Sequence, residues 1–236
     1  GYRFDMGPSV FTEPHLVDEL FVMSGKNPRD HFNYIKLDPV YRYFYEDGTM
    51  LDAWHGKEKF SEEMAARTGV PREDIARYLE KTKTVYDLTE EVFLQNSLHK
   101  LKNFFTWPVF RGFLNFGKIG AFDTMNGVNQ KAFSDPRMVK IFNRYATYNG
   151  SSPYLAPATL NVIAHVEIMK GAYYPIGGMV SITRSLAKLG ADIGVQFHYS
   201  TPVQEIIIEN KKAVGVRTGK GAENFDVVIS NMDVYN

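Results

Sequence analysis

The sequence contains no cysteine, which excludes disulfide bridges, thiolate nucleophiles and thiolate metal sites. A reducing compartment is the simplest interpretation of this absence. No run of eighteen apolar residues is present, and the opening residues, GYRFDMGPSV, do not resemble a signal peptide. The chain also has no net charge, because 27 basic residues balance 27 acidic ones. That balance argues against nucleic acid as the main partner.

Signatures of catalysis by side chains alone are missing as well. The six histidines are His15, His31, His55, His99, His165 and His198. No two of them lie four residues apart, so we predict no metal site. A G-x-S-x-G elbow is absent, which leaves hydrolase chemistry without support. The residues alone therefore identify no catalytic group, and we assign none.

The composition is that of a globular protein, with 44% apolar and 23% charged residues in 236 positions. Alternating and helical patterns predict the following elements in the first quarter: a strand at Tyr2–Phe4, a helix capped by Thr12 and running to Met23, and strands at Asn33–Leu37, Tyr41–Tyr45 and Met50–Trp54. An Asp47-Gly48 turn is expected between the last two strands.

The middle of the chain, about 57–170, has a helical pattern, and Pro71 fits the first turn of a helix that could extend to Leu98. Strands follow: one at 193–197, a hairpin turning near Asn210-Lys211, and a short buried strand at 225–230. This order of strands, helices and strands predicts an α+β, or interleaved α/β, fold with a mixed β-sheet.

The stretch YYPIGGMVSITRSLAKLG, residues 173–190, places two glycines before an amphipathic helix. Met179, Ile182, Leu186 and Leu189 share one face of that helix. Gly177 and Gly178 permit close approach of a backbone or a ligand. The pattern alone leaves two interpretations open, a phosphate cradle and a tight packing joint, and the local sequence favours the joint.

The segment Val92–Phe122 lacks acidic residues but contains Lys100, Lys102, Arg111 and Lys118. It also holds seven of the 17 phenylalanines. Aromatic and basic residues without acidic ones are typical of a helix that lies on an anionic bilayer. A helix that buries its aromatic side chains in the core is the alternative.

Three stretches carry a resemblance to a known family: GYRFDMGPSVFTEPHLVDELF at the start, FNRYATYNGSSPY at 142–154, and YYPIGGM with VVISNMD at 227–233. Together they resemble the phytoene desaturase-type carotenoid desaturases, which are FAD-dependent oxidoreductases related to flavin amine oxidases. The stretch RYATYNGSSPY is similar to the sequences of the family branch that acts on 1-hydroxylated carotenoids at the 3,4 bond.

The resemblance implies contacts with FAD at five positions. Gly7 and Pro8 match a turn that passes near the isoalloxazine, where glycine permits close backbone approach. Val203 matches a position that meets the adenine, and Ser230 and Asn231 end a strand that returns to the flavin sheet. The alternative for the first two is a plain turn, and for Val203 simple core burial. The glycine pair 177–178 is then expected to serve the joint between lobes and the cofactor cavity.

The resemblance also implies two domains: residues 1–175 as a substrate-binding lobe, and 176–236 as part of a Rossmann-like FAD-binding domain. The family's G-x-G-x-x-G unit and its last flavin-contacting motif do not occur in the sequence. We therefore expect a chain that by itself binds FAD poorly and is inactive.

The function implied for the parent enzyme is desaturation of a long polyene, with FAD as the cofactor, a carotenoid as the substrate and the membrane surface as a partner. Its expected location is cytoplasmic, peripheral on the inner face of the membrane. The resemblance leaves open whether the protein forms a homo-oligomer. An isomerase or saturase of the same family, or a lobe that only binds lipid, are the alternatives.

Four polar residues are candidates for the side of a substrate tunnel. They are Asp135, Arg137, Tyr145 and Tyr148. We favour simpler roles for all four: a helix cap with an ion pair for the first two, and core aromatic packing for the tyrosines.

Overall fold

The computed structural model describes residues 1–2, 4–90, 120 and 122–233. The chain divides into two compact units, Gly1–Ser185 and Leu186–Asn236, and each is described by itself. This structural division falls inside a helix. The predicted division at 175/176 separates a substrate-binding lobe from part of an FAD-binding domain, and it stays a prediction. The segment Val92–Phe122, predicted to lie on a membrane, is outside the described residues except for Gly120 and Phe122.

Unit 1 holds most of the helices. They are α1 (His15–Met23), η1 (Pro28–Asp30), α2 (Lys57–Thr68), α3 (Arg72–Thr89), α5 (Met125–Ala132), α6 (Pro136–Asn143), η4 (Arg144–Asn149), η5 (Ala158–Asn161), α7 (Val162–Ala164) and the π-helix η6 (His165–Lys170). Its strands are β1 (Tyr34–Lys36), β2 (Tyr41–Phe44), β3 (Met50–Ala53) and β4 (Tyr173–Pro175). The helix α8 (Val180–Asp192) begins in unit 1 and ends in unit 2.

Local sequence signals explain several of these boundaries. Gly69 ends α2 with a φ of +73°, a conformation that glycine adopts without strain, and its N–H bonds to the Ala65 carbonyl. Pro71 is the residue just before α3, whereas the sequence placed it in the first turn of that helix. The predicted extension of α3 beyond residue 90 lies outside the described residues. Asp135 caps α6 by accepting a hydrogen bond from the Arg137 N–H.

Both small sheets of unit 1 are antiparallel pairs. The strands β2 and β3 form the predicted hairpin, with Asp47 accepting a hydrogen bond from the Thr49 N–H in the turn. The strands β1 and β4 pair across a long separation, with Ile35 opposite Tyr174. This pairing brings the end of the helical region back beside the start of the chain.

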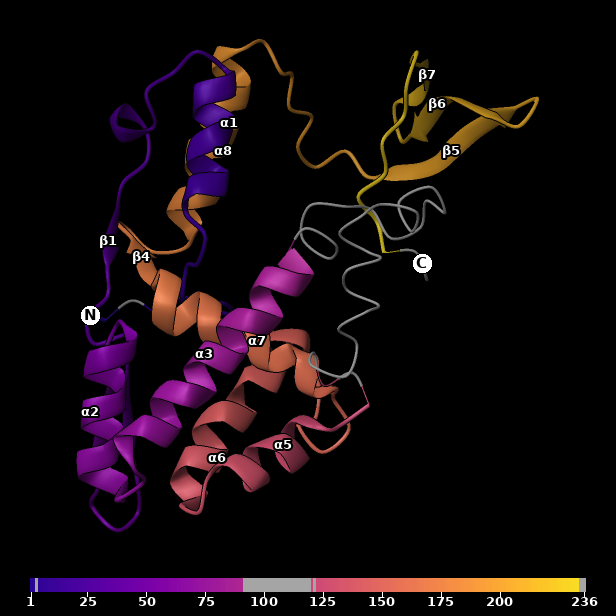
Figure 1. Cartoon of the computed structure of the whole chain (residues 1–236). Helices are drawn as coiled ribbons and strands as arrows, with labels where there is room; N and C mark the ends of the chain where they lie inside the picture. Colours follow the sequence, from indigo (N-terminus) through magenta and orange to yellow (C-terminus); the bar gives the residue numbers. More distant parts are fainter. Residues whose placement is uncertain (3, 91–119, 121, 234–236) are drawn as a thin grey trace. The chain divides into compact units, whose positions relative to one another are not determined.

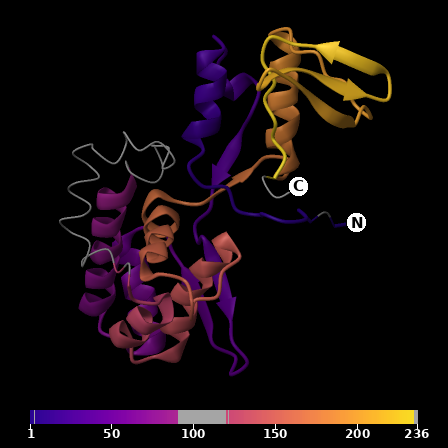
Figure 2. The same cartoon turned by 90° about the vertical axis from the view of Figure 1, so that its right-hand side faces the viewer.

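The core of unit 1 lies among α2, α3, α5 and α6, which gather at one end of the unit in both views (Figures 1 and 2). Its largest fully buried side chains include Phe60, Met64, Ile75, Leu79, Met138 and Phe142. Burying each such side chain contributes on the order of 1.5–3 kcal/mol. These helices therefore form a stable base for the polar groups described below.

Unit 2 contains a three-stranded antiparallel sheet in the order β5-β6-β7, with bounds Val203–Glu209, Lys212–Thr218 and Gly221–Asn224. Asn210 and Lys211 both have positive φ, +49° and +66°, which is the signature of a tight hairpin turn. The predicted turn at these two residues is confirmed.

Other predicted elements are wrong. No strand forms at Tyr2 and Phe4, at 193–197 or at 225–230, and the first helix starts at His15 after Pro14 rather than from a Thr12 cap. Val227 and Ile229 are 71% and 90% exposed. Apolar alternation alone does not make a strand, because a strand needs a neighbour to complete its hydrogen bonds. Among the described residues these segments belong to no strand pair, although the Phe225 N–H donates to the Val214 carbonyl of β6 at 2.9 Å.

The α+β class is confirmed. The strand pairs that the described residues form are antiparallel, in three small sheets rather than one mixed sheet.

Candidate functional site

A cluster of polar side chains lies inside unit 1, beside the apolar core. We call it the arginine–tyrosine cluster, and its members are Tyr41, Tyr43, Arg144, Tyr145, Tyr148 and Glu167. Two come from β2, three from η4 and one from the π-helix η6. The three from η4 belong to the stretch RYATYNGSSPY that carries the family resemblance.

Glu167 is the centre of the cluster, and its side chain is fully buried, with 0% exposure. Its Oε1 accepts a hydrogen bond of 2.7 Å from Nη2 of Arg144. The hydroxyl of Tyr148 donates to its Oε2, also at 2.7 Å. Both carboxylate oxygens therefore have charged or polar partners, which a buried carboxylate requires.

Arg144 is held on several sides. Its Nε donates to the hydroxyl of Tyr43 at 3.2 Å. The guanidinium lies 4.1 Å from the ring centre of Tyr41 and 4.6 Å from that of Tyr145. These distances are within the range of cation–π attraction. The guanidinium is thus fixed in position by one ion pair, one hydrogen bond and two aromatic faces.

The cluster keeps its phenols neutral and its guanidinium charged. Burial raises the pKa of Tyr43 to about 12, although Arg144 opposes this shift. Burial, followed by the charge of Glu167, raises the pKa of Tyr148. Burial by itself would lower the pKa of Arg144. The surrounding tyrosines and Glu167 raise this pKa by more than burial lowers it, so the net pKa of Arg144 is raised. The Arg144–Glu167 ion pair thus lies among phenols that stay neutral.

The π-helix that presents Glu167 is itself unusual, since π-helices are rare and frequently occur at functional sites. It makes polar contacts on other sides too. Lys170 bonds to Glu13 at 2.8 Å and to the Tyr86 hydroxyl at 2.7 Å. Two ion pairs, one of them to the buried carboxylate of Glu167, and rare backbone geometry in one short segment mark η6 as part of a candidate site.

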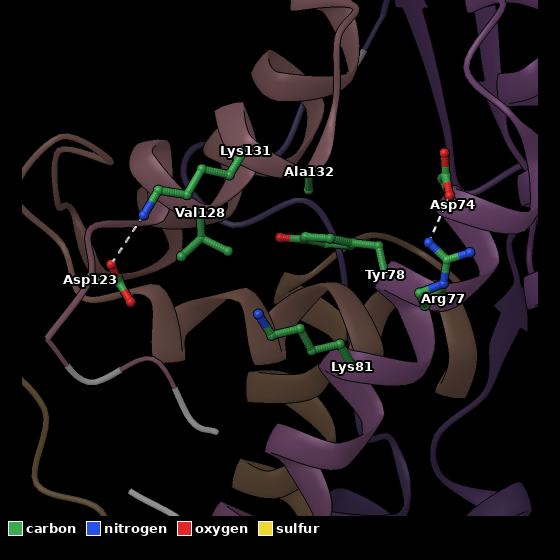
Figure 3. Close-up of a pocket in the computed structure, with 8 residues that line it drawn as sticks. All are labelled: Asp74, Arg77, Tyr78, Lys81, Asp123, Val128, Lys131 and Ala132. Carbon is green, nitrogen blue, oxygen red and sulfur yellow. Dashed lines mark hydrogen bonds and ion pairs between the residues drawn. The ribbon is translucent and has the colours of Figure 1, made fainter. Parts of the chain in front are cut away.

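An open groove of about 520 Å³ lies between α3 and α5, near the helix ends (Figure 3). It is lined by Asp74, Arg77, Tyr78, Lys81, Asp123, Val128, Lys131 and Ala132. The Tyr78 hydroxyl donates to the buried side chain of Asn129. The rim cations Arg77 and Lys131 are paired with acids, at 2.8 and 3.7 Å. The groove thus presents two surface ion pairs beside the ring of Tyr78. Its lining residues do not form an arrangement that indicates a reaction.

The five residues predicted to contact FAD are not brought together within one unit. Gly7 and Pro8 lie exposed in unit 1, and Val203, Ser230 and Asn231 lie exposed in unit 2. Val203 is 53% exposed, so its alternative role in simple core burial is wrong. Gly7 has a φ of +122°, and a Cβ added there would meet no atom within 4 Å. This open backbone fits the approach of a flat ring, and the assignments stay predictions.

The glycine pair 177–178 has a structural explanation. Asp5 accepts a hydrogen bond of 3.0 Å from the N–H of Met179, at the start of α8. A Cβ on Gly178 would lie 2.9 Å from Oδ1 of the same Asp5. A carboxylate of the chain itself therefore occupies the position that a phosphate would need. This contact supports the packing joint.

The simpler roles of the four tunnel candidates are largely confirmed. Asp135 caps α6 and pairs with Arg137 at 2.7 Å. Tyr145 is 1% exposed and belongs to the core. Tyr148 departs from the expectation, because it is 42% exposed and its hydroxyl is bound to Glu167.

The sequence interpretation missed Arg144 and Glu167. The one sequence signal for Arg144 is its place next to Tyr145 in RYATYNGSSPY, the stretch that carries the family resemblance. No local pattern indicates that its partner is Glu167, 23 residues away.

No group of side chains suited to a metal ion occurs among the described residues. None of the helices that the structure describes combines the length and apolar character that a bilayer crossing needs.

Comparison with known families assigns the chain to a family. The model of the flavin containing amine oxidoreductase family matches residues 1–236, and the chain belongs to this family. That membership confirms the predicted family and its flavin cofactor.

Curated relatives show which enzymes the chain is similar to in sequence. The chain is 42% identical over 235 residues to the 1-hydroxycarotenoid 3,4-desaturase of Flavobacterium sp. (strain P99-3), covering 100% of this chain and 48% of that protein. It is 30% identical over 238 residues to the 4,4'-diapolycopene oxygenase of Methylomonas sp, covering 99% of this chain and 47% of that protein. The chain therefore spans about half the length of the relatives it matches.

A solved structure, the Rab GDI of Plasmodium falciparum, is similar with a TM-score of 0.41 and 12% sequence identity, over 91% of this chain and 46% of that one.

Proposed function

We propose that the protein carrying this chain is an FAD-dependent carotenoid desaturase that acts on 1-hydroxylated acyclic carotenoids at the 3,4 bond. The observation that carries the proposal is the 42% identity to a 1-hydroxycarotenoid 3,4-desaturase over the whole of this chain. The relatives named oxygenases are less similar, at 30% identity. Desaturation is therefore favoured over oxygenation.

The reaction removes a hydride from one allylic carbon and a proton from the neighbouring carbon, so that a new double bond forms. The flavin, when bound, supplies this two-electron oxidation. The residues of this chain would bind and orient the polyene and exclude water. Gly7, Pro8, Val203, Ser230 and Asn231 are the positions proposed to contact the cofactor.

Product analysis tests the reaction. The full-length protein, loaded with FAD, is incubated with a 1-hydroxylated acyclic carotenoid, and the products are examined by mass and absorption spectroscopy. Loss of two hydrogens with a longer chromophore supports desaturation. An unchanged mass supports the isomerase alternative, a gain of two hydrogens the saturase, and a gain of oxygen an oxygenase.

The proposed contact of Gly7 with the flavin has its own test. Gly7→Val is expected to lower the amount of bound FAD. Its control is Gly25→Val, because Gly25 also has a positive φ, +71°, and also has open space around it. Both variants bear backbone strain, so equal flavin content in the two would remove Gly7 from the cofactor site.

Peripheral attachment to the cytoplasmic face of the membrane is part of the proposal. Its support is the composition of Val92–Phe122, where basic residues near an anionic surface contribute on the order of 1 kcal/mol each. Changing Lys100, Lys102, Arg111 and Lys118 to Glu is expected to abolish sedimentation with anionic vesicles. A folded variant that still sediments would contradict the attachment. Self-association into a homo-oligomer stays a prediction, and analytical ultracentrifugation of the full-length protein tests it.

A further inference from the structure

The arginine–tyrosine cluster has donors and acceptors that its internal bonds do not use. A guanidinium has five N–H donors. The bonds of Arg144 to Tyr43 and Glu167 use Nε and Nη2, and neither engages the donors on Nη1. The Tyr148 hydroxyl donates its one hydrogen to Glu167 and also interacts with the Tyr41 hydroxyl. Because a hydroxyl oxygen has two lone pairs, it can still accept one further hydrogen bond.

Both residues that carry these groups are partly accessible to solvent. Tyr148 is 42% exposed, and the side chain of Arg144 is 25% exposed. Glu167 below them is fully buried. The buried carboxylate therefore orients two partly exposed residues, and the aromatic rings of Tyr41 and Tyr145 flank the guanidinium.

The chemistry of these groups selects one kind of ligand. The ion pair leaves the cluster without net charge, so a charged ligand gains little from it. A ligand atom that accepts from Arg144 and donates to Tyr148 satisfies both groups at once. An alcohol oxygen does this, whereas a hydrocarbon end leaves both groups without a ligand partner.

We propose that Arg144 and Tyr148 bind a hydroxyl group at the end of the polyene and so determine specificity for hydroxylated substrates. This assignment rests on the proposed function. Glu167 acts as a positioning residue, because it touches the two binding groups and not the substrate.

A pair of substrates tests the assignment in the full-length, FAD-loaded protein. One is a 1-hydroxylated acyclic carotenoid, and the other is the same polyene without its hydroxyl group. Two quantities are measured for each: the dissociation constant, from quenching of tryptophan fluorescence by the polyene, and kcat/KM. Wild type is expected to prefer the hydroxylated polyene in both.

Tyr148→Phe removes the acceptor but leaves the Arg144–Glu167 ion pair in place. It is expected to reduce the preference about tenfold, the size of one net hydrogen bond, with little effect on the polyene that lacks the hydroxyl. The control is Tyr154→Phe, in the same sequence stretch, whose phenol is 66% exposed. It should keep the wild-type preference.

Three results separate the two proposals. An unchanged preference in Tyr148→Phe, or no preference in wild type, overturns the hydroxyl-binding assignment. Equal losses for both polyenes show a purely structural role, which also overturns it. If neither polyene is desaturated, the proposed reaction fails, but the ratio of dissociation constants still decides whether the hydroxyl is bound here.

Discussion

At the scale of single residues, the unusual choice is a fully buried carboxylate paired with a partly buried guanidinium. Replacing such a pair by apolar side chains often leaves stability unchanged or improves it, since removing two charges from water is costly. Glu167 and Arg144 are therefore poorly explained by stability alone. The bonds of Glu167 to Arg144 and to the partly exposed Tyr148 favour a role in orienting these two side chains.

Removing only one partner should be harmful. Glu167→Gln keeps the shape but leaves the charge of Arg144 unpaired, and we expect a loss of about 2–3 kcal/mol in the free energy of unfolding. The loss stays below that for a fully buried pair because the Arg144 side chain is 25% exposed. Urea unfolding measures it. Glu46→Gln at an exposed position is the control, expected to change stability by less than about 0.5 kcal/mol. Equal stability of the two variants would contradict this account.

Tyr43 gives the cluster a dependence on alkaline pH. Burial raises its pKa to about 12 in the folded chain, above the value of about 10 for an exposed tyrosine. Between these values the unfolded chain has lost the proton while the folded chain retains it. Stability from this group is therefore complete below pH 10 and is lost as the pH rises toward 12.

The measurement compares wild type with Tyr43→Phe. Urea midpoints are recorded at pH 8, 10 and 11, and wild type is expected to lose more stability over this range than the variant. Parallel curves would show that Tyr43 titrates in the folded chain as it does in the unfolded one.

At the scale of elements, the start of α8 depends on a contact across 174 residues, from Asp5 to the Met179 N–H. Gly177 and Gly178 both have positive φ, +91° and +86°. Only Gly178 has Asp5 close to where a Cβ would lie, because the nearest atom for Gly177 is on Ser181 at 3.9 Å. The two neighbouring glycines are therefore matched in strain and differ in their contacts.

Gly177→Ala should destabilise the chain by about 1–2 kcal/mol through backbone strain. Gly178→Ala should lose more, because the new methyl group displaces Asp5 from the start of α8. The additional loss should largely disappear when Asp5→Ala is made in both backgrounds, which thermal unfolding of the four variants measures as a coupling energy. Zero coupling would mean that Asp5 does not hold this helix start.

At the scale of the whole molecule, the question is whether this chain holds the cofactor by itself. A dinucleotide's pyrophosphate is bound mainly by free N–H groups at a helix N-terminus. In α8 the Met179 N–H is already bound to Asp5. The proposed contacts at Gly7 and Val203 address only the ring and the adenine, and they lie in different units.

The 236-residue chain is accordingly expected to purify without flavin colour and to bind added FAD weakly. Isothermal titration calorimetry with FAD checks this. Full-length protein serves as the positive control. One-to-one binding at micromolar concentration would reveal a cofactor site in the chain that these contacts do not include.

Features that depend on neighbouring residues were predictable from the sequence. Examples are the turn at Asn210-Lys211, the cap by Asp135 and, to within one residue, the start of a helix at Pro71. Each follows from the backbone preference or side-chain reach of a residue within a few positions. The family was also predictable, from three stretches spread along the chain.

Which distant groups meet depends on the way the chain packs in three dimensions. The Glu167–Arg144 pair and the Asp5–Met179 contact depend on how helices pack and where a π-helix interrupts the regular pattern, and no local preference encodes either. The alternating segments 193–197 and 225–230 show the converse, since they have the strand pattern but form no strand pair among the described residues, where only the Phe225 N–H bonds to a strand, at the Val214 carbonyl of β6. A strand or a buried charge is stable only when its partner is in place, and the partner is supplied by the fold.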